Sequence, residues 1–533
     1  NIDGSTFNVI SIEASHSGDI NVDLVGNISL NQIYISSSYD AYVELNLDQV
    51  TLQGNIELYS YLIGPSAAVL VDATSLSGSF DHILLSAEDG GGLDFNADEY
   101  SITLNDLHLY ASGARFDSSI SYINFTGNAG GSTFQNFNLE AYDGGNINLN
   151  LLGDLSLGGS LILKADGSWS LEHSAIVFNA GIDGSSLDNL HIEAVNGGNV
   201  TAHLSGDITV HEGIFVSVDD ATYSITSGNI LMDHAALTLS ANEGVNISST
   251  TDGFLDGIHG TFTDLTLSAD FMSTICLDSP DLGGINTITG NVLISVNHSS
   301  DISLTANIDG SLLNNMSIEA GYGNVNLELD GNISLNNVYI KTDTLGNALL
   351  NFDDLTLYGN IEQYASISTD NTNDVAYSLL GGNSINGTFD HVFLSAENGG
   401  ASGFLFETIN INVEDVHLYA SGTRYTAGVA YAAFYGNHIH GSTIQNLTLE
   451  AYDGGYVNAS GDKLNHLAAE SFSLTDSISL FANGQNEDLH GVEDSTINLN
   501  ANIDGSTFNV ISIEASHSGD INVDLVGNIS LNQ

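Results

Sequence analysis

The sequence predicts an all-β fold, a parallel β-helix (β-solenoid) with about 20–25 residues per coil and roughly 22 coils. Three observations predict it. Apolar and polar residues alternate over short runs, Gly, Asn and Asp interrupt these runs at close intervals, and related segments return along the whole chain. No window shows a sustained helical period, and the content of Gly, Asn, Ser and β-branched residues disfavours helix.

The strand pattern is clearest in residues 144–167. Alternating runs at 147–151, 155–157 and 161–163 are separated by Gly-Asp and Gly-Gly, which are typical turn residues. The segments that begin at Gly18 and Gly323 have the same pattern. We therefore expect about three strands per coil, because a β-sandwich would need hairpins and would not repeat itself at the length of one coil.

The alternation also predicts which side chains face inward. In the segment ISIEA we expect Ile10, Ile12 and Ala14 to point into the core and Glu13 to point outward. Small residues match Ala14 in related segments, which predicts a tight inner corner: Ala141, Ala194, Ala320 and Ala451. At the bends, stacked Asn side chains are expected to form hydrogen bonds from one coil to the next.

Two levels of repetition organise the chain. Residues 1–32 are identical to residues 502–533, and residues 1–145 resemble residues 307–455. The identity of the two 32-residue segments indicates one period plus an overlap. We therefore expect residues 1–533 to form one continuous solenoid from a longer tandem array.

The strand-and-turn segments, such as GNVNLELDGNISLNNVYI from Gly323, resemble the coil repeats of filamentous-haemagglutinin-type adhesins and other giant bacterial surface proteins. The resemblance extends over nearly the whole chain. It implies a right-handed β-helix in a secreted, elongated protein of the cell surface. The glycine-rich calcium nonapeptide of related acidic repeats is missing, and GGGLDFNADEY from Gly90 is a single distant echo of it.

The charge restricts the partners. There are 66 Asp and Glu residues against 5 Lys and Arg, so the net charge is -61, which excludes nucleic acid as a partner. Along a rod of roughly 105 Å this is about one charge per 2 Å, close to the density of duplex DNA. We therefore expect an extracellular medium rich in cations, with Ca²⁺ or other cations held non-specifically on the acidic surface. A purely solubilising role of the acids is the alternative.

Specific metal sites have few candidates. The turn carboxylates lie beside glycines and could contribute to calcium binding, with solvated turn acids as the simpler interpretation: Asp89, Asp143, Asp154 and Asp453. His438 and His440 would share one face of a strand and could chelate a metal, although ordinary coil residues are again simpler. Because Cys276 is the single cysteine, a disulfide framework is excluded.

No feature of the sequence indicates a catalytic site, so we expect the chain not to be an enzyme and to have no catalytic residues. A polysaccharide-acting β-helix enzyme would need converging acids and a base. The five cations are scattered: Arg115, Lys164, Lys341, Arg424 and Lys463. A glutamate recurs at one coil position and is expected to be a solvated charge of the outer face: Glu13, Glu140, Glu193, Glu319, Glu450 and Glu514.

The expected function is an extracellular structural filament protein that self-associates end to end, since the same segment occurs at both ends of the sequence. The alternative is the stalk of a giant cell-surface adhesin that spaces a separate binding head, and cell-surface or glycan contact stays open. Lateral assembly through outward aromatic residues is a further expectation: Tyr59, Tyr61, Tyr142 and Tyr452. No apolar run is long enough to span a membrane.

Overall fold

The computed structural model describes residues 2–61, 67–114, 120–167, 173–218, 221–227, 230–242, 246–248, 258–278, 287–367, 376–422, 430–439, 441–461, 473–484 and 494–532. Contacts within the chain divide it into two compact units, Asn1–Gly260 and Thr261–Gln533. Each unit is described by itself. That one solenoid runs through residues 1–533 therefore stays a prediction.

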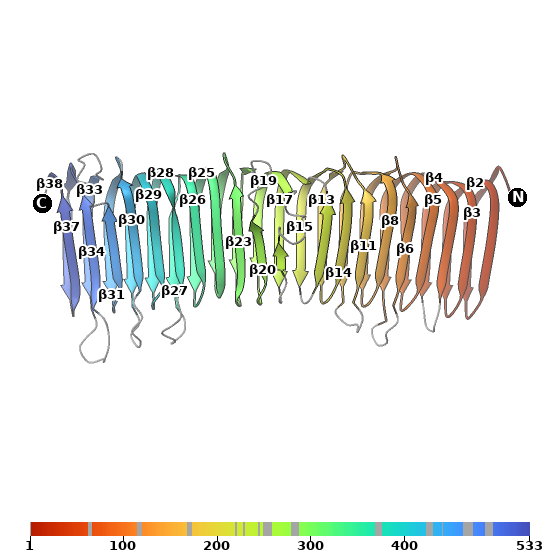
Figure 1. Cartoon of the computed structure of the whole chain (residues 1–533), viewed down its shortest axis with the longest axis horizontal. Coiled ribbons are helices and arrows are strands. Elements are labelled where there is room, and N and C mark those ends of the chain that lie inside the picture. Colours follow the sequence, from red (N-terminus) through yellow and green to blue (C-terminus); the bar gives the residue numbers. More distant parts are fainter. Residues whose placement is uncertain are drawn as a thin grey trace. The chain divides into compact units, whose positions relative to one another are not determined.

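Both units are built from parallel strands without a helix among the described residues (Figure 1). The strands of the first unit are β1 (Ser5–Ser15), β2 (Asp19–Ser38), β3 (Tyr42–Tyr61), β4 (Ala68–Glu88), β5 (Gly92–Ser112), β6 (Tyr122–Asn128), β7 (Thr133–Tyr142), β8 (Asn146–Asp154), β9 (Ser156–Leu157), β10 (Ser160–Asp166), β11 (Ala175–Gly181), β12 (Ser186–Leu187), β13 (Asn189–Val195), β14 (Asn199–Ser205), β15 (Ile208–Val218), β16 (Thr222–Ser227), β17 (Ile230–Asn242) and β18 (Asn246–Ser248).

The second unit repeats this architecture, and most of its first strand, β19, lies beyond the Gly260 boundary. Its strands are β19 (Ile258–Ala269), β20 (Thr274–Asp278), β21 (Thr287–Ile288), β22 (Asn291–Val296), β23 (Ser300–Asn307), β24 (Leu312–Ala320), β25 (Gly323–Asp343), β26 (Asn347–Leu357), β27 (Ile361–Ser366), β28 (Tyr377–Glu397), β29 (Ala401–Ser421), β30 (Tyr431–Ile439), β31 (Thr443–Tyr452), β32 (Tyr456–Gly461), β33 (Ser473–Asn483), β34 (Ser495–Asn502), β35 (Ser506–Phe508), β36 (Val510–Ser516), β37 (Gly519–Val526) and β38 (Ile529–Leu531).

One coil contains three paired segments, as β25 shows. Its residues Val325 and Ile333 pair in parallel with β26, whereas Val338 pairs with β27. The register shifts between the first two segments, next to Gly331, whose φ of 98° lies in the left-handed region. The expected parallel β-solenoid with about three strands per coil is therefore confirmed within each unit.

The coils vary in length more than the expected 20–25 residues. Met316 pairs with Val338 on the next coil, 22 residues later, whereas Ile478 pairs with Ile511, 33 residues later. The longer coil includes residues 485–493, which lie outside the described residues. Additional length is thus accommodated between strands without changing the stacking of equivalent strands.

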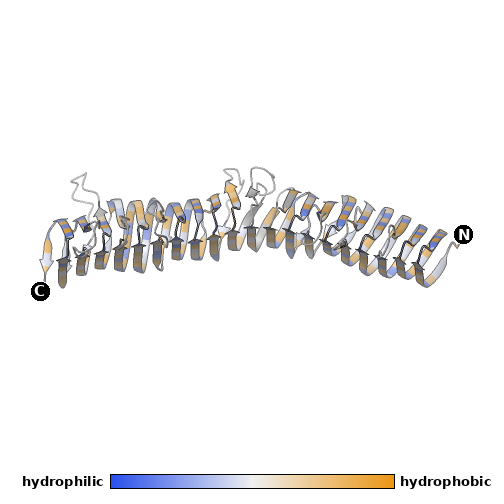
Figure 2. Ribbon diagram, turned by 90° about the horizontal axis from the view of Figure 1, so that it is seen from below, coloured by the Kyte–Doolittle hydropathy of each residue, from blue (hydrophilic) through white to orange (hydrophobic). Residues whose placement is uncertain are grey.

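Equivalent inward residues of successive coils stack into apolar columns. Leu139, Leu163 and Ile192 lie in register on β7, β10 and β13, and all three are fully buried. Aromatic rings stack in the same way, with 5.2 Å between the ring centroids of Phe95 and Phe125. Figure 2 shows the alternation of apolar and polar residues along the strands. Burial of these columns is the main favourable term for folding.

The expected tight corner lies directly after the small inward residue at Ala141 and at Ala451. Ala141 is fully buried, and Asp143 adopts a left-handed backbone with φ of 50°. A Cβ at Gly145 would lie 2.0 Å from the carbonyl oxygen of Ala111 on the coil before. The related corner behind Ala451 has the same crowding, because a Cβ at Gly455 would lie 2.0 Å from a backbone oxygen. Glycine is therefore required by the close approach of two coils.

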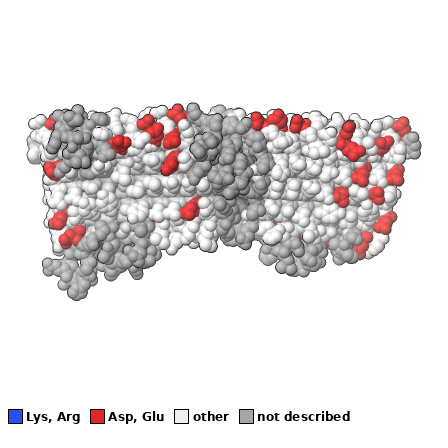
Figure 3. Space-filling view, in the orientation of Figure 1, with Lys and Arg blue, Asp and Glu red and all other residues white. Residues whose placement is uncertain are grey.

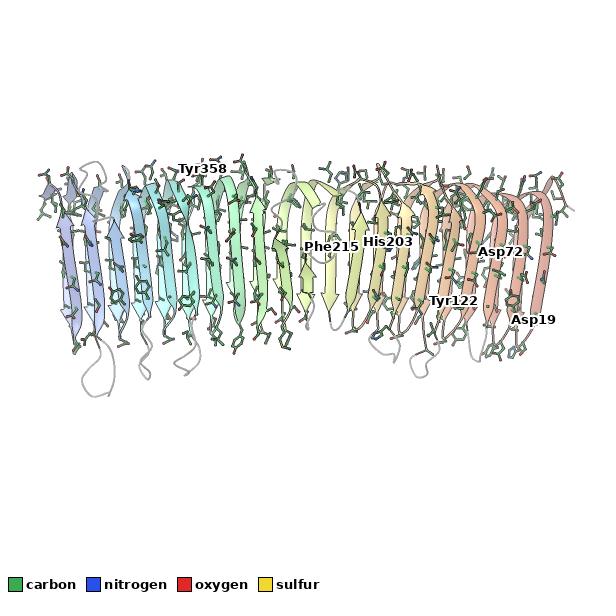
Figure 4. All side chains as sticks on the ribbon, viewed as in Figure 1. Asp19, Asp72, Tyr122, His203, Phe215 and Tyr358 are labelled. Carbon is green, nitrogen blue, oxygen red and sulfur yellow. The ribbon has the colours of Figure 1, made fainter. Side chains whose placement is uncertain are left out.

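Polar side chains stack on the outside. Asn337 donates to Asn315 at 3.0 Å, and Asn315 donates to Asn291 at 2.9 Å, across three coils. In the first unit Asn96 donates to Asp72 at 2.9 Å, and Asp72 is labelled in Figure 4. The expected coil-to-coil hydrogen bonds of asparagine are thus confirmed.

The apolar columns predict that substitutions at neighbouring residues of β11 differ sharply in their effect on the free energy of unfolding. Phe178 is fully buried and its ring packs 5.6 Å from that of Phe137, whereas Val177 is 39% exposed. Phe178→Ala is expected to reduce the free energy of unfolding by about 3–5 kcal/mol. The control Val177→Ala is expected to change it by less than about 0.5 kcal/mol. Hydrogen exchange of the β8, β11 and β14 amides measures both, and equal effects would contradict the inward assignment.

Candidate functional site

A set of outward side chains recurs in both units and forms the candidate site. We call each copy a ledge. The first ledge consists of Glu57, Tyr59, His82, Leu84, Asp106, His108, Tyr110, Glu140 and Tyr142, and the second of Glu362, Tyr364, His391, Phe393, Asp415, His417, Tyr419, Glu450 and Tyr452. Both lie on the equivalent strands of the resembling segments 1–145 and 307–455.

Parallel register brings these side chains together although they are far apart in sequence. In the second unit Glu362, Phe393 and His417 occupy the same position on three successive coils. Their inward neighbours, Val392 and Val416, are buried in the core. Because side chains alternate between the two faces of a strand, burial of these valines places the ledge on the outer surface.

A glutamate, a histidine and a tyrosine form the first cluster of each ledge. His82 Nε2 lies 3.2 Å from Glu57 Oε1, and the Tyr59 hydroxyl donates to Glu57 Oε2 at 3.3 Å. The second ledge reproduces this geometry, with 3.2 Å from His391 Nε2 to Glu362 Oε1. The backbone N–H of His82 donates to the side chain of Asn55 on the preceding coil, and the backbone N–H of His391 donates to the equivalent Asn360.

A second cluster lies two coils further along. His108 Nε2 lies 3.6 Å from Glu140 Oε1, and His417 Nε2 lies 3.2 Å from Glu450 Oε2. Asn138 and Tyr142 donate to Glu140 at 2.7 and 3.1 Å. These contacts lower the pKa of Glu140 to about 2, and His108 is the largest cause. Burial raises the pKa, but the hydrogen bonds from Asn138 and Tyr142 act with His108 and outweigh that effect.

Aromatic rings run beside the carboxylates. The ring centroids of Tyr364 lie 5.7 Å from Tyr339 and 5.4 Å from Phe393, and the Tyr34–Tyr59 pair of the first unit is 5.8 Å apart. Burial, followed by the charge of Glu362, raises the pKa of Tyr364 to about 12. Tyr364 therefore stays protonated near neutral pH, and its hydroxyl donates to Glu362.

The second ledge borders an open surface hollow of about 500 Å³. The hollow is lined by Glu362, Tyr364, His391, Val392, Phe393, Asp415, Val416, His417 and Thr448. Its volume is in the range of small-ligand sites. It presents carboxylate oxygens, imidazole nitrogens and aromatic faces, but its lining contains no lysine or arginine.

The recurring glutamates fall into two groups. Glu13, Glu319 and Glu514 are exposed, as expected for solvated charges. Glu140, Glu193 and Glu450 are half-buried and contact neighbouring side chains. Sequence reasoning treated all six alike. The signal that distinguishes Glu140 and Glu450 is the retention of His and Tyr around them in both copies.

The calcium candidates do not converge in the structure. Asp89, Asp143 and Asp453 adopt left-handed turn conformations on separate coils, and Asp154 ends β8. Among the described residues no group of three or more His, Cys, Asp or Glu side chains could hold a metal ion. Of the histidine pair, His438 lies on β30 and His440 lies outside the described residues.

The remaining predicted residues are placed as follows. Lys164 Nζ lies 3.3 Å from Glu193 Oε2, and Lys341 is exposed on β25. Arg115, Arg424 and Lys463 lie outside the described residues. Cys276 is half-buried on β20. The four tyrosines expected on the surface point outward, with Tyr61 39% exposed and the others half-buried: Tyr59, Tyr142 and Tyr452.

Comparison with family models, curated proteins and solved structures found no match for the chain. The resemblance to filamentous-haemagglutinin-type adhesins thus stays an expectation. Within the part of the chain that is described, no helix is long and apolar enough to cross a membrane.

The lowered pKa of Glu140 predicts a pH dependence. Because its folded-state pKa of about 2 lies below the ordinary value of 4.5, the ionised carboxylate stabilises the fold above pH 4.5, and this contribution is lost as the pH falls toward 2. Glu140→Gln is therefore expected to be less stable than the unchanged chain at pH 7, with the difference disappearing in that acid range. Urea unfolding at a series of pH values measures it.

The control for this experiment is Glu99→Gln, which removes one exposed carboxylate from the same unit. A Glu140→Gln curve that stays parallel to the curve of the unchanged chain down to pH 2 would contradict the stabilising role of the Glu140 carboxylate.

Proposed function

We propose that the chain is a module of an extracellular structural filament in which the β-solenoid continues end to end. This proposal rests on how the 32-residue segment, which occurs twice in the sequence, pairs with its neighbouring coils. The first copy pairs with the coil that follows it, through Ile10 and Ile33. The second pairs with the coil that precedes it, through Ile511 and Ile478.

Burial within the two copies supports the same conclusion. Ile28 and Leu30 are buried under the next coil in the first copy, whereas the equivalent Ile529 and Leu531 of the second copy are 40% and 61% exposed. Conversely, Phe508 is fully buried, and the equivalent Phe7 is only half-buried. The segment therefore has two apolar surfaces, one toward each neighbour, and each is covered only where a coil is present.

The register within the two copies is identical. Ser5 pairs with Ile28 in the first copy, and Ser506 pairs with Ile529 in the second. A further coil can therefore follow the second copy with the same hydrogen bonds and apolar contacts that follow the first. Such continuation covers strand edges and core residues that a coil without a neighbour exposes.

The charge supports a location in a cation-rich medium. Figure 3 shows Asp and Glu side chains, and no Lys or Arg among the coloured residues, on one face. With a net charge of -61, separate modules repel each other unless salt or divalent ions screen them. We infer that assembly takes place outside the cell, where such ions are abundant.

The alternative function, an adhesin stalk, needs the same continuity but within one polypeptide. A stalk spaces a separate binding head and requires no stacking between molecules. The two functions therefore differ in whether separate copies of the chain associate, which is measurable.

Association is tested by a substitution on the exposed coil. The unchanged chain is expected to form end-to-end multimers with added calcium or salt, seen as a mass increase in light scattering and as fibres in electron micrographs. Ile513→Asp is expected to abolish them, because Ile513 is 55% exposed on β36 at a core position that the next coil must cover.

The matched control is Ser512→Asp, which adds the same charge to the outward neighbour on the same strand. It is expected to leave assembly unchanged. An unchanged chain that stays monomeric under all these ionic conditions would rule out stacking between molecules and favour the stalk.

A further inference from the structure

We propose that the hollow of the second ledge is a binding site for an organic cation, namely an alkylammonium or guanidinium group. It is formed by the outer faces of β27, β28, β29 and β31. This inference does not depend on the proposed filament function, because it concerns outward side chains, whereas end-to-end continuation depends on inward residues.

The lining has the chemistry that such a cation requires. Glu362 and Asp415 supply two carboxylates, and Tyr364 and Phe393 supply two aromatic rings whose centroids are 5.4 Å apart. Carboxylates attract and accept hydrogen bonds from a cation, and the face of an aromatic ring attracts it through the ring quadrupole. The two carboxylates repel an anion, and no lysine or arginine is among the lining residues to offset them.

The chain itself shows an ammonium group in a comparable setting. In the first unit Lys164 Nζ lies 3.3 Å from Glu193 Oε2 and 6.0 Å from the ring centroid of Tyr142. Tyr142 also donates to Glu140, two residues before it, just as Tyr364 donates to Glu362. On this ladder the ring of such a tyrosine on one side and the carboxylate of Glu193 on the other therefore accommodate an ammonium group.

At the register position of Lys164, the described part of the second unit has no cation. Lys164 lies in register with Glu140, and the residue in register with the equivalent Glu450 is Phe481, whose ring packs 5.2 Å from Tyr452. Lys341 lies in register with Tyr364 on the preceding coil, but it does not line the hollow. Since no lysine or arginine is among the described residues that line the hollow, we assign its carboxylates and rings to a cation from outside the chain.

The carboxylates retain capacity for a ligand. Glu362 interacts with Tyr364 and His391, and Asp415 Oδ1 accepts a hydrogen bond from Asn446 at 2.8 Å. A carboxylate offers about four acceptor positions, so each has room for a further donor. The hydrogen bonds already present fix the orientation of the carboxylates and reduce the entropic cost of binding.

A single residue difference between the units provides the decisive variant. Phe393 occupies the position held by Leu84 in the first ledge. Phe393→Leu therefore removes one ring from the hollow while introducing a residue that the same coil position accepts elsewhere in the chain. Glu362→Gln removes one carboxylate charge without changing its shape.

Binding is tested by calorimetry of the full chain at physiological ionic strength. The two cationic probes are spermidine and a short peptide containing one arginine, which distinguish a free polyamine from a basic protein segment; the neutral probe is maltotriose. A saturable site for at least one cationic probe is expected. Phe393→Leu and Glu362→Gln are each expected to weaken it on the order of tenfold.

The control is Glu328→Gln, which makes the same charge change at an exposed position of the same unit and is expected to leave the affinity unchanged. The proposal would be overturned by three results: cation binding that all three variants alter equally, which would mean non-specific attraction to the acidic surface; saturable binding of maltotriose alone, which would mean a glycan site; or no saturable binding.

Discussion

Stacking of equivalent inward residues from one coil to the next is the constraint on which the structure depends. A coil has no core of its own. Leu163 is buried because Leu139 lies on one side of it and Ile192 on the other, in a register fixed by parallel backbone hydrogen bonds. Every coil therefore needs two neighbours, and the repeated 32-residue segment shows both kinds of contact in its two copies. The proposed end-to-end continuity is the same requirement applied to the outermost coils.

The outward positions are free of this constraint, which makes their repetition informative. Stacking does not require that Glu57, Tyr59 and His82 return as Glu362, Tyr364 and His391 with nearly the same distances between them. Other outward residues of the ledges differ between the units, such as Leu84 and Phe393. The polar contacts of the ledges also account for the lowered pKa of Glu140, so the ledges contribute to stability as well as offering a surface for a ligand.

The two proposals use different parts of the same architecture. Filament continuity depends on inward apolar residues and open strand edges, whereas cation binding depends on outward rings and carboxylates of the second ledge. The net charge of -61 connects them, because an acidic surface both requires screening for assembly and attracts cationic ligands. A periodic scaffold can thus carry a local binding site without disturbing its core, since alternate residues along each strand face opposite sides.

The sequence by itself determined the strand class, the inward alanines, the corner glycines and the stacked asparagines, because these follow from a period of two residues and from local turn chemistry. The tertiary structure decided which outward residues meet. His391 and Glu362 lie on adjacent coils, and the spacing between paired residues of adjacent coils varies from 22 residues (Met316 to Val338) to 40 residues (Val457 to Ile497), so their contact depends on the length of each connection. The sequence alone does not distinguish the half-buried Glu140, Glu193 and Glu450 from solvated glutamates, because their partners become neighbours only when the coils stack in register.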